Sequence, residues 1–343
     1  MSKKNKTPLG IFTESIGLYF SNFDKFVKYM TFPVLGQIGG LVLTFLLTFF
    51  YAKHMPNLIM KFEVLNNLTT LIICAILITL PGLIIFVKAF WEYLVAYGAV
   101  NSMLENMLKS GKVYDFDAHT ELIKRRTIPF VGLWLLFGIF TSIGSFPLNW
   151  VPCAVFMIYF VLVFQVFTFE PELSPIGCVK KSFQLVKGHF ASTFMLFALV
   201  GALTYIFIPD IANRLFDFAK VTPLLSKAVT PFINLLPLDI LNNALATYNL
   251  KPITIDLIAT FVITTTITQI FIQYTLPLRS ILWSMWYKEL GGNTTSAVEE
   301  KGKTKSKKST KKPSEKLIEV SHKKYSTKKL DRNILKRAME KEE

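Results

Sequence analysis

The chain has 343 residues, of which 52% are hydrophobic and 18% are charged, and its formal net charge is +15. A soluble domain usually carries about 25% charged residues, so the composition argues against a large soluble helical protein. The three cysteines, Cys74, Cys153 and Cys178, are far apart. The sequence therefore predicts no disulfide framework, and it predicts no metal site or cofactor.

The N-terminal segment is basic and amphipathic. Met1–Lys6 carries three lysines, but the first long apolar run begins only near Tyr29 and no small-residue cleavage site follows it. This pattern does not match a cleavable signal peptide. In Ile11–Tyr29 the apolar side chains can share one helical face, which is typical of a helix that lies in the membrane interface.

Five long segments contain no Asp, Glu, Lys or Arg: 29–52, 64–87, 127–169, 190–209 and 257–278. A helix needs roughly 20 apolar residues to cross about 30 Å of hydrocarbon. The run 127–169 is about twice that length and contains Pro147-Leu-Asn-Trp-Val-Pro152, which favours a tight turn. We therefore predict an all-α membrane bundle of six transmembrane helices, paired as three hairpins. The spans are expected at about 30–52, 68–92, 128–146, 150–170, 190–209 and 253–278.

The short loops differ in their content of Lys and Arg. The N-terminal segment and the loops after the second and fourth spans hold 13 of these residues, against 6 on the opposite side. Since cytoplasmic loops carry the excess of positive charge, both termini are predicted to lie in the cytoplasm.

Three amphipathic segments precede the first, third and fifth spans. They are Ile11–Tyr29, Phe116–Thr127 and Pro175–Phe190. We interpret the chain as three units of similar plan, each an interfacial helix followed by a span out and a span back. Their approximate bounds are 8–112, 113–172 and 173–290.

The outer loop 210–252 is divided by prolines. Its pieces Ile211–Ala219 and Leu238–Ala246 are predicted as short helices on the outer surface. A re-entrant segment is the alternative interpretation.

The composition changes after Leu290, which divides the chain into a membrane domain, 1–292, and a basic tail, 293–343. Residues 294–343 contain 16 Lys or Arg and 8 Asp or Glu. Such low hydrophobicity predicts disorder. Anionic lipid head groups and RNA are both expected as partners of the tail, and the sequence identifies no protein partner.

Few ionisable groups lie near the predicted spans. Lys88 and Glu92 are one helical turn apart near the cytoplasmic end of the second span, and Arg279 follows the sixth span. These three form a candidate polar cluster, which Glu170 could join. A paired charge at the interface is the simpler interpretation of Lys88 and Glu92.

The most polar midplane stretch is Thr264–Gln269. Thr265, Thr268 and Gln269 are either hydrogen-bonding groups for helix packing or part of a polar path. The four histidines are scattered, and no HxxxH, GxSxG or GxxxxGK[ST] pattern occurs. No catalytic residue is predicted, and we do not expect an enzyme.

Residues Phe169–Phe190 carry a recognisable motif. An acidic residue ends a span, a short Pro-containing link follows, and a helix of basic-Ser-aromatic-x-Leu-x-basic-Gly pattern enters the next span. The matching residues are Glu170, Lys180, Ser182, Phe183, Leu185, Lys187 and Gly188.

This motif resembles that of a broad group of bacterial multi-span proteins. The group includes the membrane domain attached to some glycerophosphodiester phosphodiesterases and related stand-alone proteins of unknown function. The resemblance covers 8–290 weakly and implies the membrane fold in a bacterial cytoplasmic membrane. A phosphodiesterase barrel needs roughly 250 residues, for which this chain has no room, so the activity of the fusion proteins is not expected here.

We therefore expect a non-enzymatic integral membrane protein with a membrane-organising or accessory role. Its basic cytoplasmic tail would meet anionic lipid, RNA or protein. The alternative is a transporter or lipid-handling protein that uses a groove between the hairpins.

Overall fold

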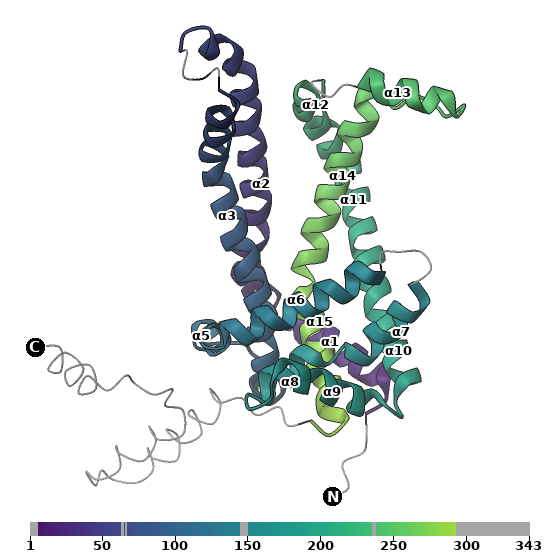
Figure 1. The fold of residues 1–343 in the computed structure, drawn as a ribbon. Helices are drawn as coiled ribbons and strands as arrows, with labels where there is room; N and C mark the ends of the chain where they lie inside the picture. Colours follow the sequence, from purple (N-terminus) through teal and green to yellow (C-terminus); the bar gives the residue numbers. More distant parts are fainter. Residues whose placement is uncertain (1–5, 63–64, 66, 145–149, 235–237, 293–343) are drawn as a thin grey trace, which may run out of the picture. The chain divides into compact units, whose positions relative to one another are not determined.

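The computed structural model describes residues 6–62, 65, 67–144, 150–234 and 238–292, and among these it contains helices and no β-strand (Figure 1). The chain divides into two compact units, 1–299 and 300–343, and every described residue belongs to the first. The predicted tail and the first half of the turn Pro147–Pro152 lie outside the described residues. The helices are α1 Pro8–Ser21, α2 Phe23–Ile59, α3 Leu68–Ser102, α4 Leu104–Ser110, α5 Phe116–Lys124, α6 Thr127–Gly144, α7 Trp150–Phe160, α8 Val163–Phe169, α9 Pro175–Val186, α10 Phe190–Gly201, the π-helix η3 Ala202–Phe207, α11 Ile208–Phe218, α12 Val221–Ile233, α13 Leu238–Thr247, α14 Ile255–Tyr274 and α15 Leu276–Glu289.

Several helices are long and apolar enough to cross a membrane. Within the described part of the chain there are five such stretches, Phe23–Ile59, Leu68–Ser102, Trp150–Phe169, Phe190–Phe218 and Ile255–Glu289. The number rises to seven if two bent pairs, α5 with α6 and α12 with α13, each count as one span. A helical bundle with membrane-length apolar helices is thus confirmed.

The three amphipathic segments predicted before the spans are separate short helices. They are α1, α5 and α9, each followed within a few residues by an apolar helix. The axis turns by 78° between α5 and α6. Ser174 accepts a hydrogen bond from the Gly177 backbone nitrogen at 3.2 Å and so caps the start of α9.

Helix α1 ends at a residue that fastens it to a distant loop. Nδ2 of Asn22 donates to the Gly111 carbonyl at 2.9 Å, and its Oδ1 accepts from the Val113 nitrogen at 2.8 Å. Asn22 is buried, so both the donor and the acceptor of its side-chain amide are hydrogen-bonded within the protein, where water does not reach them. This clamp explains why Ile11–Tyr29 forms α1 and the start of α2 rather than one helix.

Helices α2 and α3 form a tightly packed antiparallel pair (Figure 1). A Cβ built on Gly40 would lie 2.5 Å from the Phe86 nitrogen, and one on Gly82 would lie 2.6 Å from the Thr44 nitrogen. A Cβ on Gly36, one turn before Gly40, would lie 2.8 Å from the Cβ of Ala89. Small residues spaced by four allow two backbones to touch, and they place this pair in direct backbone contact.

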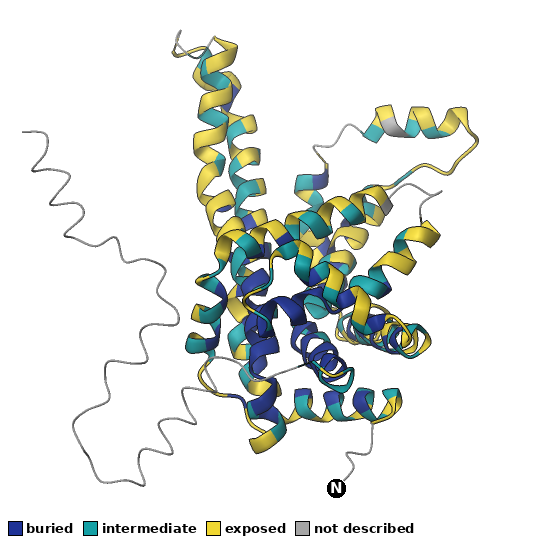
Figure 2. Ribbon diagram, turned by 60° about the horizontal axis from the view of Figure 1, so that its bottom comes forward, coloured by how far each residue is buried: buried dark blue, intermediate teal, exposed yellow. Residues whose placement is uncertain are grey.

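Burial is concentrated toward one end of the molecule. Every residue of α8 is buried, as is the segment from Gly98 to Ser102 of α3, and most of α15 joins them in one cluster. We call this cluster the basal core. In contrast, α2 and the first two thirds of α3 expose large apolar side chains along their length (Figure 2). Such faces are stable when lipid covers them.

The outer loop contains more helix than the sequence suggested. The helix from Phe190 continues through η3 and Pro209 into α11 without a break, as one stretch Phe190–Phe218. The pieces predicted at Ile211–Ala219 and Leu238–Ala246 correspond to α11 and α13, and α12 lies between them.

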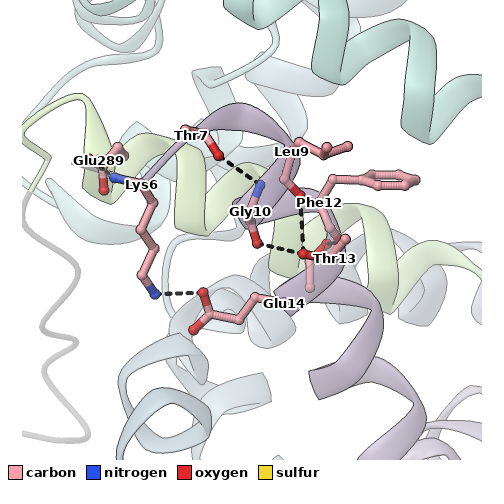
Figure 3. Close-up of polar contacts among 9 residues, drawn as sticks. Lys6, Thr7, Leu9, Gly10, Phe12, Thr13, Glu14 and Glu289 are labelled. Carbon is pink, nitrogen blue, oxygen red and sulfur yellow. Dashed lines mark hydrogen bonds and ion pairs between the residues drawn. The ribbon is translucent and has the colours of Figure 1, made fainter. Parts of the chain in front are cut away.

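The two ends of the described bundle meet. The Lys6 nitrogen donates to Oε1 of Glu289 at 2.9 Å, and the Lys6 ammonium contacts Glu14 (Figure 3). In the same view, Thr7 caps α1 by accepting from the Gly10 nitrogen at 3.2 Å. The start of α1 is therefore held against the end of α15.

Candidate functional site

An open cavity lies between α2 and α3. It has a volume of about 310 Å³ and is lined by Tyr29, Phe32, Pro33, Lys88 and Glu92. We call it the Lys88 cavity. Two of the residues in the predicted polar cluster, Lys88 and Glu92, therefore line the same space.

The two charged residues of the Lys88 cavity do not pair with each other. The Lys88 ammonium lies 5.5 Å from the centre of the Phe32 ring, and Oε1 of Glu92 binds the Lys124 ammonium at 2.8 Å. Lys124 is the last residue of α5, so the interfacial helix supplies the partner of Glu92.

Tyr29 joins the cavity to the same interfacial helix. Its hydroxyl lies 2.7 Å from the Thr120 hydroxyl, and its ring stacks on Phe116 with centroids 4.4 Å apart. These contacts hold α2, α3 and α5 together around the cavity. The site can accept an anionic group at Lys88 and a cationic group at the second carboxylate oxygen of Glu92.

Arg279 lies outside the cavity and is held by neutral groups. Its guanidinium donates to the Ile272 carbonyl at 2.9 Å, to the Tyr93 hydroxyl at 3.4 Å, and to the Tyr205 hydroxyl. The guanidinium also lies over the Tyr205 ring, 4.8 Å from its centre. Tyr205 belongs to the π-helix η3, so Arg279 joins η3 to the junction of α14 and α15.

Glu170, the fourth member considered for the cluster, lies at the basal core. It accepts from the Tyr287 hydroxyl at 2.6 Å and lies 3.9 Å from the Lys181 ammonium. Glu92, Glu170 and Arg279 thus each have different polar partners. The structure brings Lys88 and Glu92 together and places Glu170 and Arg279 elsewhere.

The motif residues of α9 divide into one buried face and one exposed face. Ser182 is buried and donates to the Tyr159 carbonyl at 2.8 Å, and the Phe183 ring lies 4.7 Å from the Tyr159 ring. Leu185 packs against the basal core. Gly188 has a φ of +92°, which favours glycine at the turn into α10. The motif lysines Lys180 and Lys187 are exposed.

The polar stretch of α14 supplies one contact between helices. Thr268 accepts from Nδ2 of Asn213 on α11 at 2.8 Å, whereas Thr265 and Gln269 are exposed. One turn further, Nε2 of Gln37 donates to Oε1 of Gln273 at 3.1 Å. These bonds join α14 to α11 and to α2.

A buried polar network in the basal core is absent from the sequence predictions. Oδ1 of Asn101 accepts from Nε2 of Gln165 and from the hydroxyl of Ser284, both at 3.1 Å, and also from the hydroxyl of Ser280. All four residues are buried. They come from α3, α8 and α15, so only the tertiary packing brings them together. The only feature of the sequence that could have indicated this network is Gln165, an isolated polar residue in an apolar run.

A second missed pair consists of Ser102 and His119. The Ser102 hydroxyl lies 2.6 Å from Nδ1 of His119, and both residues are fully buried. Burial lowers the pKa of His119 from 6.5 to about 4, because the charged form loses its hydration. The pair fastens α5 to the end of α3.

Comparison of the chain with protein-family models, with characterised proteins and with solved structures found no match. The functional argument consequently depends on the geometry and chemistry of the chain itself.

Proposed function

We propose that this chain is a non-enzymatic multi-pass protein of a bacterial cytoplasmic membrane that organises the membrane or assists another membrane component. In this proposal the six spans are α2, α3, α6, α7 with α8, the helix from α10 to α11, and α14. Helices α1, α5 and α9 lie in the cytoplasmic interface.

The observation that carries the proposal is the contact between the two ends of the bundle. Lys6 and Glu289 are hydrogen-bonded, so both lie on the same side of any membrane that the helices cross. Only an even number of spans places both ends on one side. Six spans result when α6 is counted and the bent pair of α12 and α13 is assigned to the outer surface.

Charge supports the orientation. The side that carries α1, α5 and α9 holds 13 of the 19 Lys and Arg residues counted in the predicted loops, and such residues favour the cytoplasm. Several of them form ion pairs there, including Lys124 with Glu92 and Lys109 with Glu105.

The accessory role is supported by the charge of the tail. The tail follows Gly292, and its basic residues begin at Lys301. Each Lys or Arg near an anionic leaflet contributes about 1 kcal/mol of attraction. A tail with 16 such residues would hold anionic lipid, RNA or an acidic protein surface.

Purification in mild detergent tests this role. The intact chain and a version that ends at Leu290 would be isolated, and everything that co-purifies would be identified by mass spectrometry. The proposal predicts proteins or RNA that are lost with the tail. A matched control replaces the lysines of residues 301–312 with glutamine, which removes charge at constant length. The same partners on all three versions would contradict the proposal.

A lipid-handling role is the second candidate, and the Lys88 cavity favours it. The cavity is open and lined by aromatic rings beside one ammonium and one carboxylate. A lipid or metabolite that stays bound after removal of the tail would place the function in the membrane domain.

A further inference from the structure

We propose that the Lys88 cavity binds the head group of an amine-bearing phospholipid, with the phosphate at Lys88 and the primary ammonium at Glu92. The chemistry recognised is a phosphoethanolamine group. This inference rests on the proposed placement in the membrane, and it is independent of the tail and its partners.

The first argument is the separation of two opposite charges. Lys88 and Glu92 are at positions i and i+4 of α3, so their side chains lie on one face of the helix and could reach each other. Here they do not meet: Lys88 lies over Phe32 and Glu92 turns to Lys124. The cavity of about 310 Å³ is lined by both side chains. A ligand with one negative and one positive group can bridge them.

The second argument is that each of the two charged groups has free hydrogen-bonding positions. Only Oε1 of Glu92 is bonded to Lys124, and Oε2 has no hydrogen-bond partner among the described residues. The Lys88 ammonium lies over the Phe32 ring and makes no hydrogen bond or ion pair within the described part of the chain. An ammonium has three donors and a carboxylate has two acceptor oxygens, so both groups retain bonds for a ligand.

The third argument is the position of the cavity in the membrane. Lys88 follows the start of α3 at Leu68 by 20 residues, which at about 1.5 Å per residue corresponds to the thickness of the hydrocarbon core. Exposed Phe32 and half-buried Tyr29 line the cavity, and aromatic side chains are enriched at the depth of lipid head groups. Acyl chains would lie along the exposed apolar face of α2 and α3.

The balance of charge selects a zwitterionic head group. A purely anionic lipid satisfies Lys88 but brings no cation to Glu92. A choline head group brings a cation without an N–H, so it cannot donate to Oε2. A primary ammonium can form this charge-assisted hydrogen bond, which is about twice as strong as a neutral one.

Native mass spectrometry of the detergent-solubilised full chain tests the inference. Phosphatidylethanolamine, phosphatidylcholine and phosphatidylglycerol with identical acyl chains would be titrated separately. We expect the protein to retain phosphatidylethanolamine preferentially. We expect Glu92→Gln and Lys88→Gln each to reduce this retention by roughly tenfold. Equal retention of the choline and ethanolamine lipids would overturn the proposal.

Two control variants separate binding from folding. Lys28→Gln removes an exposed lysine one turn before Phe32 on α2 and should leave retention unchanged. Lys124→Gln breaks the ion pair of Glu92 but keeps both cavity charges, so retention should persist. If Lys124→Gln lowered retention as much as Glu92→Gln, the carboxylate would act only through α5 and the assignment would be wrong.

A competition arm distinguishes a lipid from a soluble ligand. Free O-phosphoethanolamine would be added to the protein loaded with phosphatidylethanolamine. Retention of the lipid at millimolar competitor supports a lipid site in which the acyl chains contribute. Displacement at micromolar competitor would assign the cavity to a soluble phosphoethanolamine and overturn the lipid assignment. The truncation experiment tests the partners of the tail, so its result is independent of these lipid-binding measurements.

Discussion

Gly40 of α2 and Gly82 of α3 face each other so closely that a Cβ on either would lie 2.8 Å from the carbonyl oxygen of the other. The hairpin that forms the Lys88 cavity therefore depends on two residues without side chains. Backbone atoms on the opposite helix cannot move aside as a flexible side chain can.

Replacement of Gly40 by leucine should separate α2 from α3. Overpacking typically costs about 1–3 kcal/mol, and here the obstruction is backbone. Gly40→Leu is expected to lower the thermal midpoint of the detergent-solubilised protein by several degrees. Gly39→Leu is the matched control, because a Cβ on Gly39 meets nothing within 4 Å. Equal midpoints for the two variants would show that the contact is not formed.

Asn101→Leu should destabilise the basal core. The substitution removes the acceptor shared by Gln165, Ser280 and Ser284. Gln165 and Ser280 keep their contacts with Tyr97, so Ser284 is the donor left unpaired, at a cost of about 1–3 kcal/mol. Asn243→Leu, at an exposed position of α13, provides the comparison. Thermal unfolding followed by circular dichroism measures both, and an unchanged midpoint for Asn101→Leu would contradict the network.

Stability should fall as the pH is lowered through the range in which His119 titrates. The pKa of His119 is about 4 in the folded chain against 6.5 for the unperturbed group. Between these values the unfolded state binds the proton and the folded state does not, so stability is complete above pH 6.5 and decreases toward pH 4. The shift corresponds to a loss of about 3 kcal/mol at the lower end.

Two variants isolate the contribution of His119. His119→Gln should flatten the decrease between pH 6.5 and 4, whereas His189→Gln, at an exposed position, should retain it. Unfolding midpoints measured at pH 7.5 and pH 5 for each variant give the comparison. An unaltered slope in His119→Gln would assign the effect to other groups.

Cys178 should be nearly inert to maleimide in the folded protein. The residue is fully buried, and burial raises the pKa of its thiol to about 11. Because the thiolate is the reactive form, labelling at pH 7 should be at least about a hundredfold slower than at an exposed cysteine. Gln184→Cys in a Cys178→Ser background, on an exposed position of the same helix, supplies that reference. Rapid labelling of native Cys178 would show that α9 is not packed on the basal core.

Much of the fold is predictable because lipid imposes simple rules. Segments without charge, such as 190–209, are long because a helix must satisfy its own backbone across the hydrocarbon. The beginning of α5 at Phe116 and of α9 at Pro175 also coincides with the predicted segments. In each of these elements the local pattern of apolar and charged residues suits the surroundings of the helix that it forms.

The details of the candidate site were not predictable from local patterns. Lys88 and Glu92 are neighbours on any helix, but their partners Phe32 and Lys124 come from α2 and α5. Arg279 was grouped with Glu92 by its estimated depth alone, and the structure gives it Tyr93 and Tyr205 as neighbours instead. Depth is set by residue count, whereas the direction of a side chain is set by how the helices rotate and pack.

The most direct test of the central claim is the sidedness of the two termini. Single cysteines would be placed at Ser2, Asn243 and Ser314 of a chain whose three native cysteines are replaced by serine. Intact cells would be labelled with a membrane-impermeant maleimide before and after permeabilisation. With six spans and cytoplasmic ends, the cysteine at 243 is labelled in intact cells, and those at 2 and 314 are labelled only after permeabilisation. Labelling of positions 2 and 314 from opposite sides would contradict the proposed topology and the contact between Lys6 and Glu289 from which it follows.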